Sequence, residues 1–412
     1  MFARAVLPLK NGVFSFIINY GIIGENGVFD AGKGQAMEWI ASAAFGMEGM
    51  TGRDLKHMGM QNVRVMEVGG ASFEGGFEDA FRASLWLRTC DRILLVMSRF
   101  EARSYEELFQ GVRAIAWEKL LPADAAFPVR ARCVKSQLMS PSDVQKIVKR
   151  AMVERLRGAY GAEWFSETGA VFQVDVSIRS DGVTVALDAS GEPLSRRGYR
   201  TWNGEAPLRE TLAAALVLQS GWHPWQPLHD PCCGTGTILI EAAFIALNRA
   251  PGLTRKFAME AWPCAPHAAL DAIRAEARKK FEEGSRRPLT VSGSDINPEA
   301  VELAERHVKQ AGLAGRIALS VKDLRDLNPG DDLPPEPVGV FVANPPYGER
   351  LDNTRAAHAV ARQLGELQRR FRGWKLCAFS ADTGFEQAYG RRATRRRRYY
   401  NGRIECEYRI FE

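Results

Sequence analysis

The sequence lacks the features that would place the chain in a membrane, outside the cell or around a metal ion. Its 412 residues contain no run of about 18 apolar residues, which excludes a helical membrane span. None of its seven cysteines forms a Cys-x-x-Cys pair, which argues against a zinc or iron–sulfur site and against a disulfide framework. His223, His229 and His267 also lack the spacing of metal ligands. We therefore expect a cytoplasmic protein that binds no metal.

Two other signals are missing. No G-x-x-x-x-G-K-[ST] loop is present, so a phosphate site of the P-loop type is not expected. The glycine-rich first 36 residues have no sustained helical or strand periodicity, and they lack the basic start and apolar core of a secretory signal. We expect Met37 to be the native start and residues 1–36 to be a leader without fixed structure.

What the sequence does contain is a composition typical of globular proteins, with clustered positive charge. Apolar residues make up 46% and charged residues 25%, and the formal net charge is +6. Lysines and arginines gather over residues 146–157 and again over 391–398. Such clusters favour an anionic partner, although a solvated surface can carry the same charges.

Residues 37–191 predict an α+β module. Helices are expected over 45–59, 77–89, 104–121 and 140–158, and strands over 63–68, 92–102, 129–137, 171–180 and 182–190. The last two strands form a hairpin at Asp181-Gly182. The helix over 140–158 places Val144, Val148 and Leu156 on one face, opposite basic residues. The module contains no acid/base constellation, so we expect it to be a binding domain.

After a linker over 191–207, strands and helices alternate. Helices are expected over 208–219, 238–248, 298–312 and 359–371, and strands over 228–230, 289–295, 317–323, 338–343 and 375–381. Alternation of this kind predicts a doubly wound, mostly parallel sheet. A terminal antiparallel hairpin is expected around Asn401-Gly402. Residues 249–288 form an insertion, irregular over 249–266, to which the sequence assigns no role.

A glycine turn and two strand-end acids predict a site for an adenosine-containing ligand. In "DPCCGTGT", Gly234 and Gly236 let a ligand approach the backbone and the start of the next helix, although such turns also simply reverse a chain. Asp295 ends the following strand, where an acid binds both hydroxyls of a ribose. Asp323 ends the third strand and could accept from an adenine amino group, or merely cap the next helix.

The sequence "NPPY" follows the fourth strand and indicates a site for a planar amine. The side-chain oxygen of Asn344 and the carbonyl of Pro345 are two acceptors, and the ring of Pro346 restricts the direction of that carbonyl. Holding both hydrogens of an –NH2 group favours the form whose lone pair can attack an electrophile. Tyr347 offers a face for stacking a flat substrate. The alternative is a Pro-Pro turn with a buried tyrosine.

Together these motifs resemble the class I S-adenosylmethionine-dependent amino-methyltransferases. More closely, "SRRGYR", "DPCCGTGTILIEAA" and "NPPYGERL" resemble the THUMP-containing RNA methyltransferases of the RlmL type, which modify guanine N2 in 23S rRNA. The resemblance implies a ferredoxin-like segment over 37–80, a THUMP domain over 81–191, which engages RNA in this family, and a methyltransferase domain over 192–412. Bifunctional members carry a second methyltransferase domain, which this chain does not show before Glu412.

Residue roles follow from the same resemblance. The implied cofactor contacts are Asp230, Gly234, Gly236, Asp295 and Asp323, with Tyr199, Arg200 and Thr211 in a segment that closes over S-adenosylmethionine. Catalytic roles fall on Asn344, Pro345 and Tyr347. Contacts to RNA are expected from Lys135, Lys146, Lys149, Arg395 and Arg397. We expect Cys232 and Cys233 to pack under the cofactor rather than to act as nucleophiles.

The resulting prediction is methyl transfer from S-adenosylmethionine to the N2 amine of a guanine in 23S rRNA, with RNA as the partner. Three enzymatic alternatives share the planar amine: a guanine in tRNA, the N6 amine of adenine in DNA, and the N5 amide of a protein glutamine. An RNA-binding chaperone without activity is the alternative from another class, against which the intact Asp295 and Asn344 argue.

Overall fold

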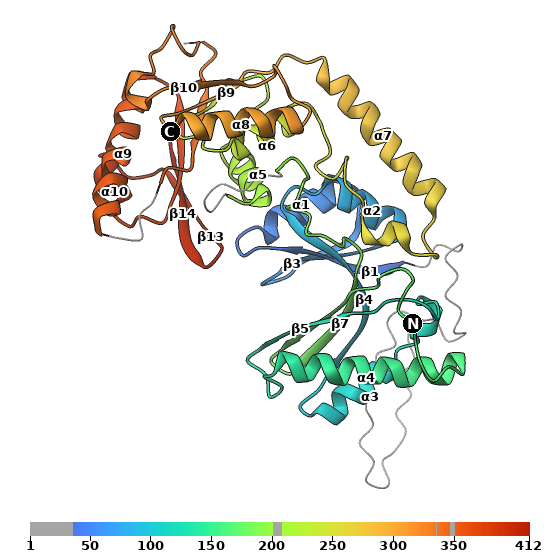
Figure 1. Cartoon of the computed structure of the whole chain (residues 1–412). Helices are drawn as coiled ribbons and strands as arrows, with labels where there is room; N and C mark the ends of the chain where they lie inside the picture. Colours follow the sequence, from blue (N-terminus) through green and yellow to red (C-terminus); the bar gives the residue numbers. More distant parts are fainter. Residues whose placement is uncertain (1–35, 201–207, 335, 347–350) are drawn as a thin grey trace, which may run out of the picture.

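The structure is a computed structural model that describes residues 36–412, apart from 201–207, 335 and 347–350. The predicted leader over 1–36 therefore lies almost entirely outside the described residues, as does Tyr347. Two sheets of seven strands each form the two halves of the molecule, with the N-terminal half below and the C-terminal half above in Figure 1.

One continuous sheet forms the N-terminal half. Its strand order is β2-β3-β1-β4-β7-β6-β5. The strands are β1 (Met37–Ala43), β2 (Gln61–Val65), β3 (Gly70–Gly75), β4 (Cys90–Glu101), β5 (Val129–Val134), β6 (Val174–Arg179) and β7 (Gly182–Asp188). The helices are α1 (Glu48–His57), α2 (Phe77–Trp86), α3 (Tyr105–Arg113) and α4 (Pro141–Tyr160), with the 3-10 turn η1 (Trp117–Lys119). Because β4 pairs with β1 on one side and β7 on the other, one sheet joins both parts of the α+β module.

Helix α4 has the capping residues and the buried apolar face that its sequence predicts. The Ser140 hydroxyl accepts from the Asp143 amide at 3.4 Å, proline stands at the first turn, and Gly161 ends the helix in the left-handed conformation. Val144 and Val148 are buried against the sheet. The predicted apolar face of this helix is confirmed.

For this half, two strands were missed and one helix was predicted too long. Strands β1 and β3 were not predicted, because "MEWIASA" and "GASFEG" mix small and polar residues without clear alternation. The helix expected over 104–121 ends at Arg113. The chain turns there so that Trp117 is fully buried and its indole donates to the Val112 carbonyl at 3.0 Å.

The C-terminal half is the predicted doubly wound sheet, in the order β10-β9-β8-β11-β12-β14-β13. Its strands are β8 (Leu228–Asp230), β9 (Val291–Asp295), β10 (Ala318–Val321), β11 (Val340–Ala343), β12 (Lys375–Ser380), β13 (Arg395–Asn401) and β14 (Ile404–Phe411). Its helices are α5 (Glu210–Gln219), α6 (Thr237–Ala246), α8 (Pro298–Gln310), α9 (Leu351–Arg370) and α10 (Phe385–Tyr389), with the 3-10 turns η2 (Ala258–Ala261) and η3 (Leu324–Asp326). Strands β8 to β12 are parallel and β13–β14 is an antiparallel hairpin, which confirms the prediction.

The insertion over 249–288 has a structural role that the sequence did not reveal. It contains the unpredicted helix α7 (His267–Ser285), which runs down to α2 in Figure 1. The indole of Trp262 is fully buried and stacks on Phe172 of the N-terminal half, with ring centroids 4.9 Å apart. Phe257 packs edge-on against Phe81 at 5.5 Å. The insertion therefore completes the core of the other half and fastens the two halves together.

A second contact joins the halves at the terminal hairpin. The ring of Tyr400, near the tip between β13 and β14, packs edge-on against Phe45 just after β1, at 5.6 Å. A side chain at Gly46 would lie 2.6 Å from the Arg398 carbonyl, so the two backbones approach closely here. No helix in the described part of the chain is long and apolar enough to cross a membrane.

The docking of the insertion gives a first prediction. Trp262→Ala removes a fully buried ring together with the hydrogen bond from its indole to the Val171 carbonyl. We expect the free energy of unfolding to fall by about 3–5 kcal/mol in urea titrations. Trp225→Ala is the matched control, since Trp225 is 67% exposed, and it should change stability by less than about 1 kcal/mol. Equal effects of the two variants would contradict the docking role.

Candidate active site

The predicted site residues of the C-terminal half meet at one edge of its sheet. Asp230 ends β8 and Asp295 ends β9, while Asp323 is the second residue after β10 and Asn344 the first after β11. These four strands are adjacent and parallel, so their carboxyl ends share one edge. In a doubly wound sheet, this edge is where ligands bind.

The glycine turn between β8 and α6 is tied to the end of β9. The Gly234 amide donates to the Asp295 carboxylate at 2.9 Å, and the Cys232 amide donates to Asp230 at 3.0 Å. Gly236 begins α6 with a φ of +79°, and a side chain there would lie 3.2 Å from the Cβ atom of Ala304. A glycine is favoured at Gly236 for both reasons.

Asp295 has the environment of a ligand-binding acid. One oxygen accepts from the Gly234 amide and the other from the Asn297 amide at 3.0 Å, which fixes the carboxylate and leaves further lone pairs. Ile296 follows it with 68% of its surface exposed. A large apolar side chain so exposed at a ligand edge is a candidate platform for a flat ring. The sequence analysis missed Ile296, although an isoleucine directly after a strand-end acid was a usable signal.

Three groups beneath the turn have raised pKa values. Burial raises the pKa of the Asp230 carboxyl above its ordinary value, and this carboxyl accepts from the Cys232 amide. Its predicted contact with the cofactor stays a prediction. Burial also raises the pKa of the Cys232 and Cys233 thiols. A thiol nucleophile needs a lowered pKa, so these cysteines are suited to packing rather than to catalysis.

Asp323 is partly engaged within its own loop. Its carboxylate accepts from the Arg325 amide at 2.8 Å and from the Arg325 guanidinium at 2.7 and 3.0 Å. Hydrogen bonding by Arg325 holds the pKa of Asp323 below its usual value. The acid therefore caps the turn η3 and remains charged, with an oxygen lone pair left over for a ligand.

Asn344 is the most unusual group at this edge. It follows four buried residues of β11, and its side-chain oxygen is buried without a hydrogen-bond partner among the described residues. Buried acceptors are nearly always satisfied, so this one calls for an explanation. Pro345 is buried beside it. Tyr347 lies outside the described residues, and its predicted stacking role stays a prediction.

Tyr199, Arg200 and Thr211 make contacts within the protein. The Tyr199 hydroxyl donates to Glu241 of α6 at 3.1 Å, and Arg200 pairs with Glu210 at 2.9 Å. Thr211 donates to Asp91 of β4, in the N-terminal half, at 3.2 Å. These contacts join α5, α6 and β4, and the expected closure over a cofactor stays a prediction.

The predicted RNA-binding residues are not brought together. Lys146 pairs with Asp143 and Lys149 with Glu167, along a groove of about 570 Å³ beside α4. Helix α4 lies at the end of the N-terminal half farthest from the C-terminal half in Figure 1. Lys135 is exposed after β5, whereas Arg395 and Arg397 lie on β13 of the other sheet. No group of three His, Cys, Asp or Glu side chains suited to a metal is found in the part of the chain that the structure describes.

The fold and the residues at this edge define a methyltransferase domain, and comparison with known proteins gives its family. A ferredoxin-like domain of the RlmL type matches residues 38–94, a THUMP domain matches residues 102–188, and the RMKL-like methyltransferase domain matches residues 197–410. The chain belongs to the RMKL-like methyltransferase family. The resemblance inferred from the motifs is confirmed.

Relatives match over nearly the whole chain. YpsC of Bacillus subtilis, a proposed RNA methyltransferase, is 38% identical over 90% of this chain and 94% of that protein. A Listeria monocytogenes structure, described as a predicted N6-adenine-specific DNA methylase, is 38% identical, covers 92% of this chain and 96% of its own, and has a TM-score of 0.85. The structure of SMU.472, a proposed methyltransferase in complex with SAH, is 36% identical, covers 91% and 98%, and also has a TM-score of 0.85.

A buried ion pair beside the site gives a second prediction. Glu241 is fully buried between Arg197, at 3.5 Å, and the Tyr199 hydroxyl. Glu241→Gln leaves the Arg197 charge uncompensated, so we expect the free energy of unfolding to fall by about 3–5 kcal/mol. Glu302→Gln is the control, because its pair with Arg306 is exposed on α8 and should contribute at most about 1 kcal/mol. A similar small loss in both variants would show that the buried pair is dispensable.

Proposed function

We propose that the chain transfers a methyl group from S-adenosylmethionine to the exocyclic N2 amine of a guanine in 23S rRNA. The observation that carries this proposal is the unpartnered, buried side-chain oxygen of Asn344 at the carboxyl end of β11. Family membership supports methyl transfer, and the likeness to the SAH complex supports the cofactor. The names of the relatives differ on the substrate: one relative is named an RNA methyltransferase and another a DNA methylase.

The residues at the sheet edge fit an adenosine-containing cofactor. Asp295 is fixed by two backbone amides and is available to the two hydroxyls of a ribose. Ile296 offers an exposed apolar surface to the adenine ring, and Asp323 an acceptor to its amino group. A side chain at Gly234 would meet nothing within 4 Å, so the backbone there is open to the rest of the cofactor. Such a cofactor supplies an electrophilic methyl group, and no pyrophosphate site is needed.

Asn344 and Pro345 act on the amine. The exocyclic amine of a nucleobase is a weak nucleophile because its lone pair is delocalised into the ring. An amide oxygen and a proline carbonyl that accept both hydrogens favour the pyramidal amine and stabilise the positive charge that develops on nitrogen. An acceptor fixed in advance, with no partner within the described protein, loses no hydrogen bond when the substrate arrives.

RNA is favoured over DNA and protein by the N-terminal half. The planar-amine site alone serves guanine N2, adenine N6 and glutamine N5 equally, since each presents an –NH2 group. The THUMP match over residues 102–188 supports an RNA substrate, and the proposal of guanine in 23S rRNA rests on the likeness to RlmL-type proteins.

Removing the acid of the cofactor site gives a third prediction. Asp295→Ala deletes two ribose contacts and the charge that fixes the glycine turn. We expect the affinity for S-adenosylmethionine, measured by calorimetry, to fall about 10- to 100-fold. Glu302→Ala on the exposed side of α8 is the matched control and should bind as the unmodified protein does. Undiminished binding by the Asp295 variant would remove the proposed cofactor site.

Removing the amine acceptor gives a fourth prediction. Asn344→Ala should lower the rate of methyl transfer to 23S rRNA about 100- to 1000-fold, the effect expected when one preorganised polar group is lost. The affinity of this variant for S-adenosylmethionine should be unchanged. The control variant Asn328→Ala, at an exposed position, should keep both the normal methylation rate and the normal cofactor affinity. Methylation by the Asn344 variant at the normal rate would refute its role.

The substrate is identified from the product. The protein is incubated with S-adenosylmethionine and, separately, with 23S rRNA, tRNA and DNA, and the digested nucleosides are analysed by mass spectrometry. N2-methylguanosine in 23S rRNA alone is the expected result. N2-methylguanosine in tRNA or N6-methyladenine in DNA would replace the proposed substrate while leaving the cofactor and the role of Asn344 in place.

A further inference from the structure

One face of the N-terminal sheet carries no helix in the described part of the chain. Helices α1 to α4 and the insertion pack on the face that contains Trp39 and Val176. The opposite face, here called the open face, has a small apolar floor that consists of Ile40, Leu94, Val96 and Ala186, with Met66 at its margin. All of these floor residues come from strands or turns of the same sheet, and no residue of a described helix belongs to the cluster.

The open face is rich in arginine. Register and strand alternation place six arginines on it, one or two from each of β2, β4, β5 and β6: Arg64, Arg92, Arg99, Arg130, Arg132 and Arg179. The same alternation places five acids there: Glu38, Glu74, Glu101, Asp175 and Asp188. Asp175 and Asp188 are buried, at 3% and 0% exposure, and Glu38 is paired with Arg99 at 2.7 Å. Arg64, Arg132 and Arg179 are exposed, so positive charge exceeds negative charge on the surface that faces solvent.

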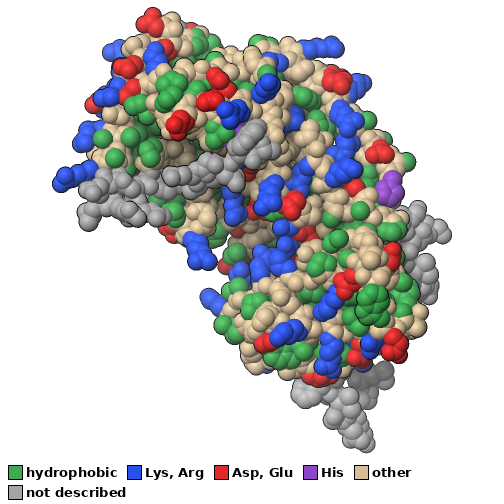
Figure 2. Space-filling view, viewed as in Figure 1, with side chains coloured by type: hydrophobic (Ala, Val, Ile, Leu, Met, Phe, Trp, Pro, Cys, Tyr) green, Lys and Arg blue, Asp and Glu red, His purple; other side chains and the backbone are tan. Residues whose placement is uncertain are grey.

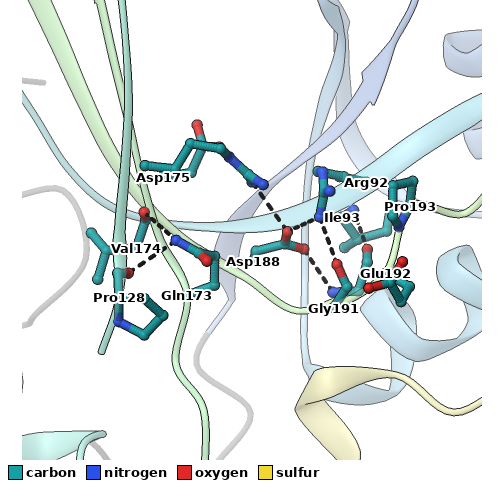
Figure 3. Close-up of polar contacts among 12 residues, drawn as sticks. Arg92, Ile93, Pro128, Gln173, Val174, Asp175, Asp188, Gly191, Glu192 and Pro193 are labelled. Atoms are coloured by element: carbon teal, nitrogen blue, oxygen red, sulfur yellow. Dashed lines mark hydrogen bonds and ion pairs between the residues drawn. The ribbon is translucent and has the colours of Figure 1, made fainter. Parts of the chain in front are cut away.

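The two buried acids hold arginines in fixed positions. Asp188 accepts from Arg92, as Figure 3 shows, and from Arg130 at 3.3 Å. Asp175 accepts from Arg130 at 2.9 Å and from Arg132 at 3.3 Å. The Arg132 side chain remains 62% exposed, and one of its five donors is used by Asp175. Arginines that are anchored from below while their other donors face solvent suit phosphate, which a guanidinium binds with two parallel hydrogen bonds.

The open face adjoins the candidate active site. Strand β14 is antiparallel to β12, so the tip of the terminal hairpin lies at the carboxyl edge of the parallel strands, where Asn344 is found. That tip contacts Phe45, directly after β1 of the N-terminal sheet. Figure 2 shows lysine and arginine side chains gathering in the recess between the two halves. A chain bound on the open face therefore leads toward Asn344, whereas one bound along α4 does not.

We propose that the open face is the surface on which the phosphate backbone of the substrate RNA lies while a base is presented to Asn344. This inference rests on the proposed RNA substrate and deepens it. Arg64, Arg132 and Arg179 contact phosphates directly. Arg92 and Arg130 are fixed by the buried acids and maintain the shape of the surface. Contacts of this kind give affinity and register without reading base sequence.

The test measures RNA binding directly, so that it does not depend on catalysis. Fragmented 23S rRNA is titrated with the full chain at several salt concentrations, and the protein is compared with the triple variant Arg64→Ala, Arg132→Ala, Arg179→Ala. We expect the dissociation constant to rise about tenfold or more and the salt slope to fall by about 2 to 3, since each lost phosphate contact lowers it by roughly 1. Loss of Arg132 leaves Asp175 paired with Arg130 at 2.7 Å, so the variant should fold.

Two further triples complete the design. Arg278→Ala, Lys279→Ala and Arg372→Ala remove the same charge from exposed positions on α7 and after α9, and should leave RNA binding nearly unchanged. Lys146→Ala, Arg150→Ala and Arg157→Ala test the face of α4 as the rival surface. Thermal melting and S-adenosylmethionine binding confirm that each variant is folded.

The possible results distinguish an error in the proposed RNA-binding surface from an error in the proposed RNA substrate. Normal binding by the open-face triple, with binding lost by the α4 triple, overturns the proposed surface and leaves the RNA substrate in place. Equal weakening by all three triples also overturns it, because the effect would then be one of net charge. A protein that binds S-adenosylmethionine but no RNA overturns the surface and the proposed substrate together.

Discussion

The arrangement of this molecule depends on a segment of one half that completes the core of the other. Residues 257–273 lie between α6 and β9 of the C-terminal sheet, yet Phe257, Trp262 and Ile273 belong to the N-terminal core. Burying aromatic rings of this size contributes several kcal/mol each, far more than the polar contacts at most interdomain surfaces. Because the insertion is anchored in both halves, the recess between them has a fixed shape, and the candidate active site opens at a fixed place relative to the N-terminal sheet.

Much of the C-terminal half could be predicted from its sequence. Parallel strands buried on both faces leave strong apolar runs, and the ends of those runs carry the residues that the chemistry needs. Asn344 was identified because it stands directly after such a run, and Asp295 because it is the acid that ends the strand after the glycine turn. The topology then brings both to one edge. Ile296 was missed although it directly follows a strand-end acid, because its exposure of 68% is visible only in the structure.

The N-terminal half was harder to predict, for physical reasons. Strands β1 and β3 contain glycine, serine and glutamate because β1 has one face in the core and the other on an open surface, which weakens the apolar signal. Helix α7 could have been predicted, since Leu270, Ile273 and Ala277 recur at helical spacing. Its docking could not, because no local pattern tells which core a helix will enter. The open face was equally hidden: Arg130 and Asp175 are 45 positions apart, and only the pairing of β5 with β6 joins them.

Strand β4 has a consequence for how the chain can be divided. Its 12 residues pair with β1 along one side and with β7 along the other. The ferredoxin-like and THUMP segments match separate sequence families, but in the structure they share strand β4 at the centre of one sheet. Neither can be excised without leaving a long row of unpaired backbone groups exposed, which invites aggregation. The two segments thus form one sheet, and a change that shifts the register of β4 alters the pairing in both.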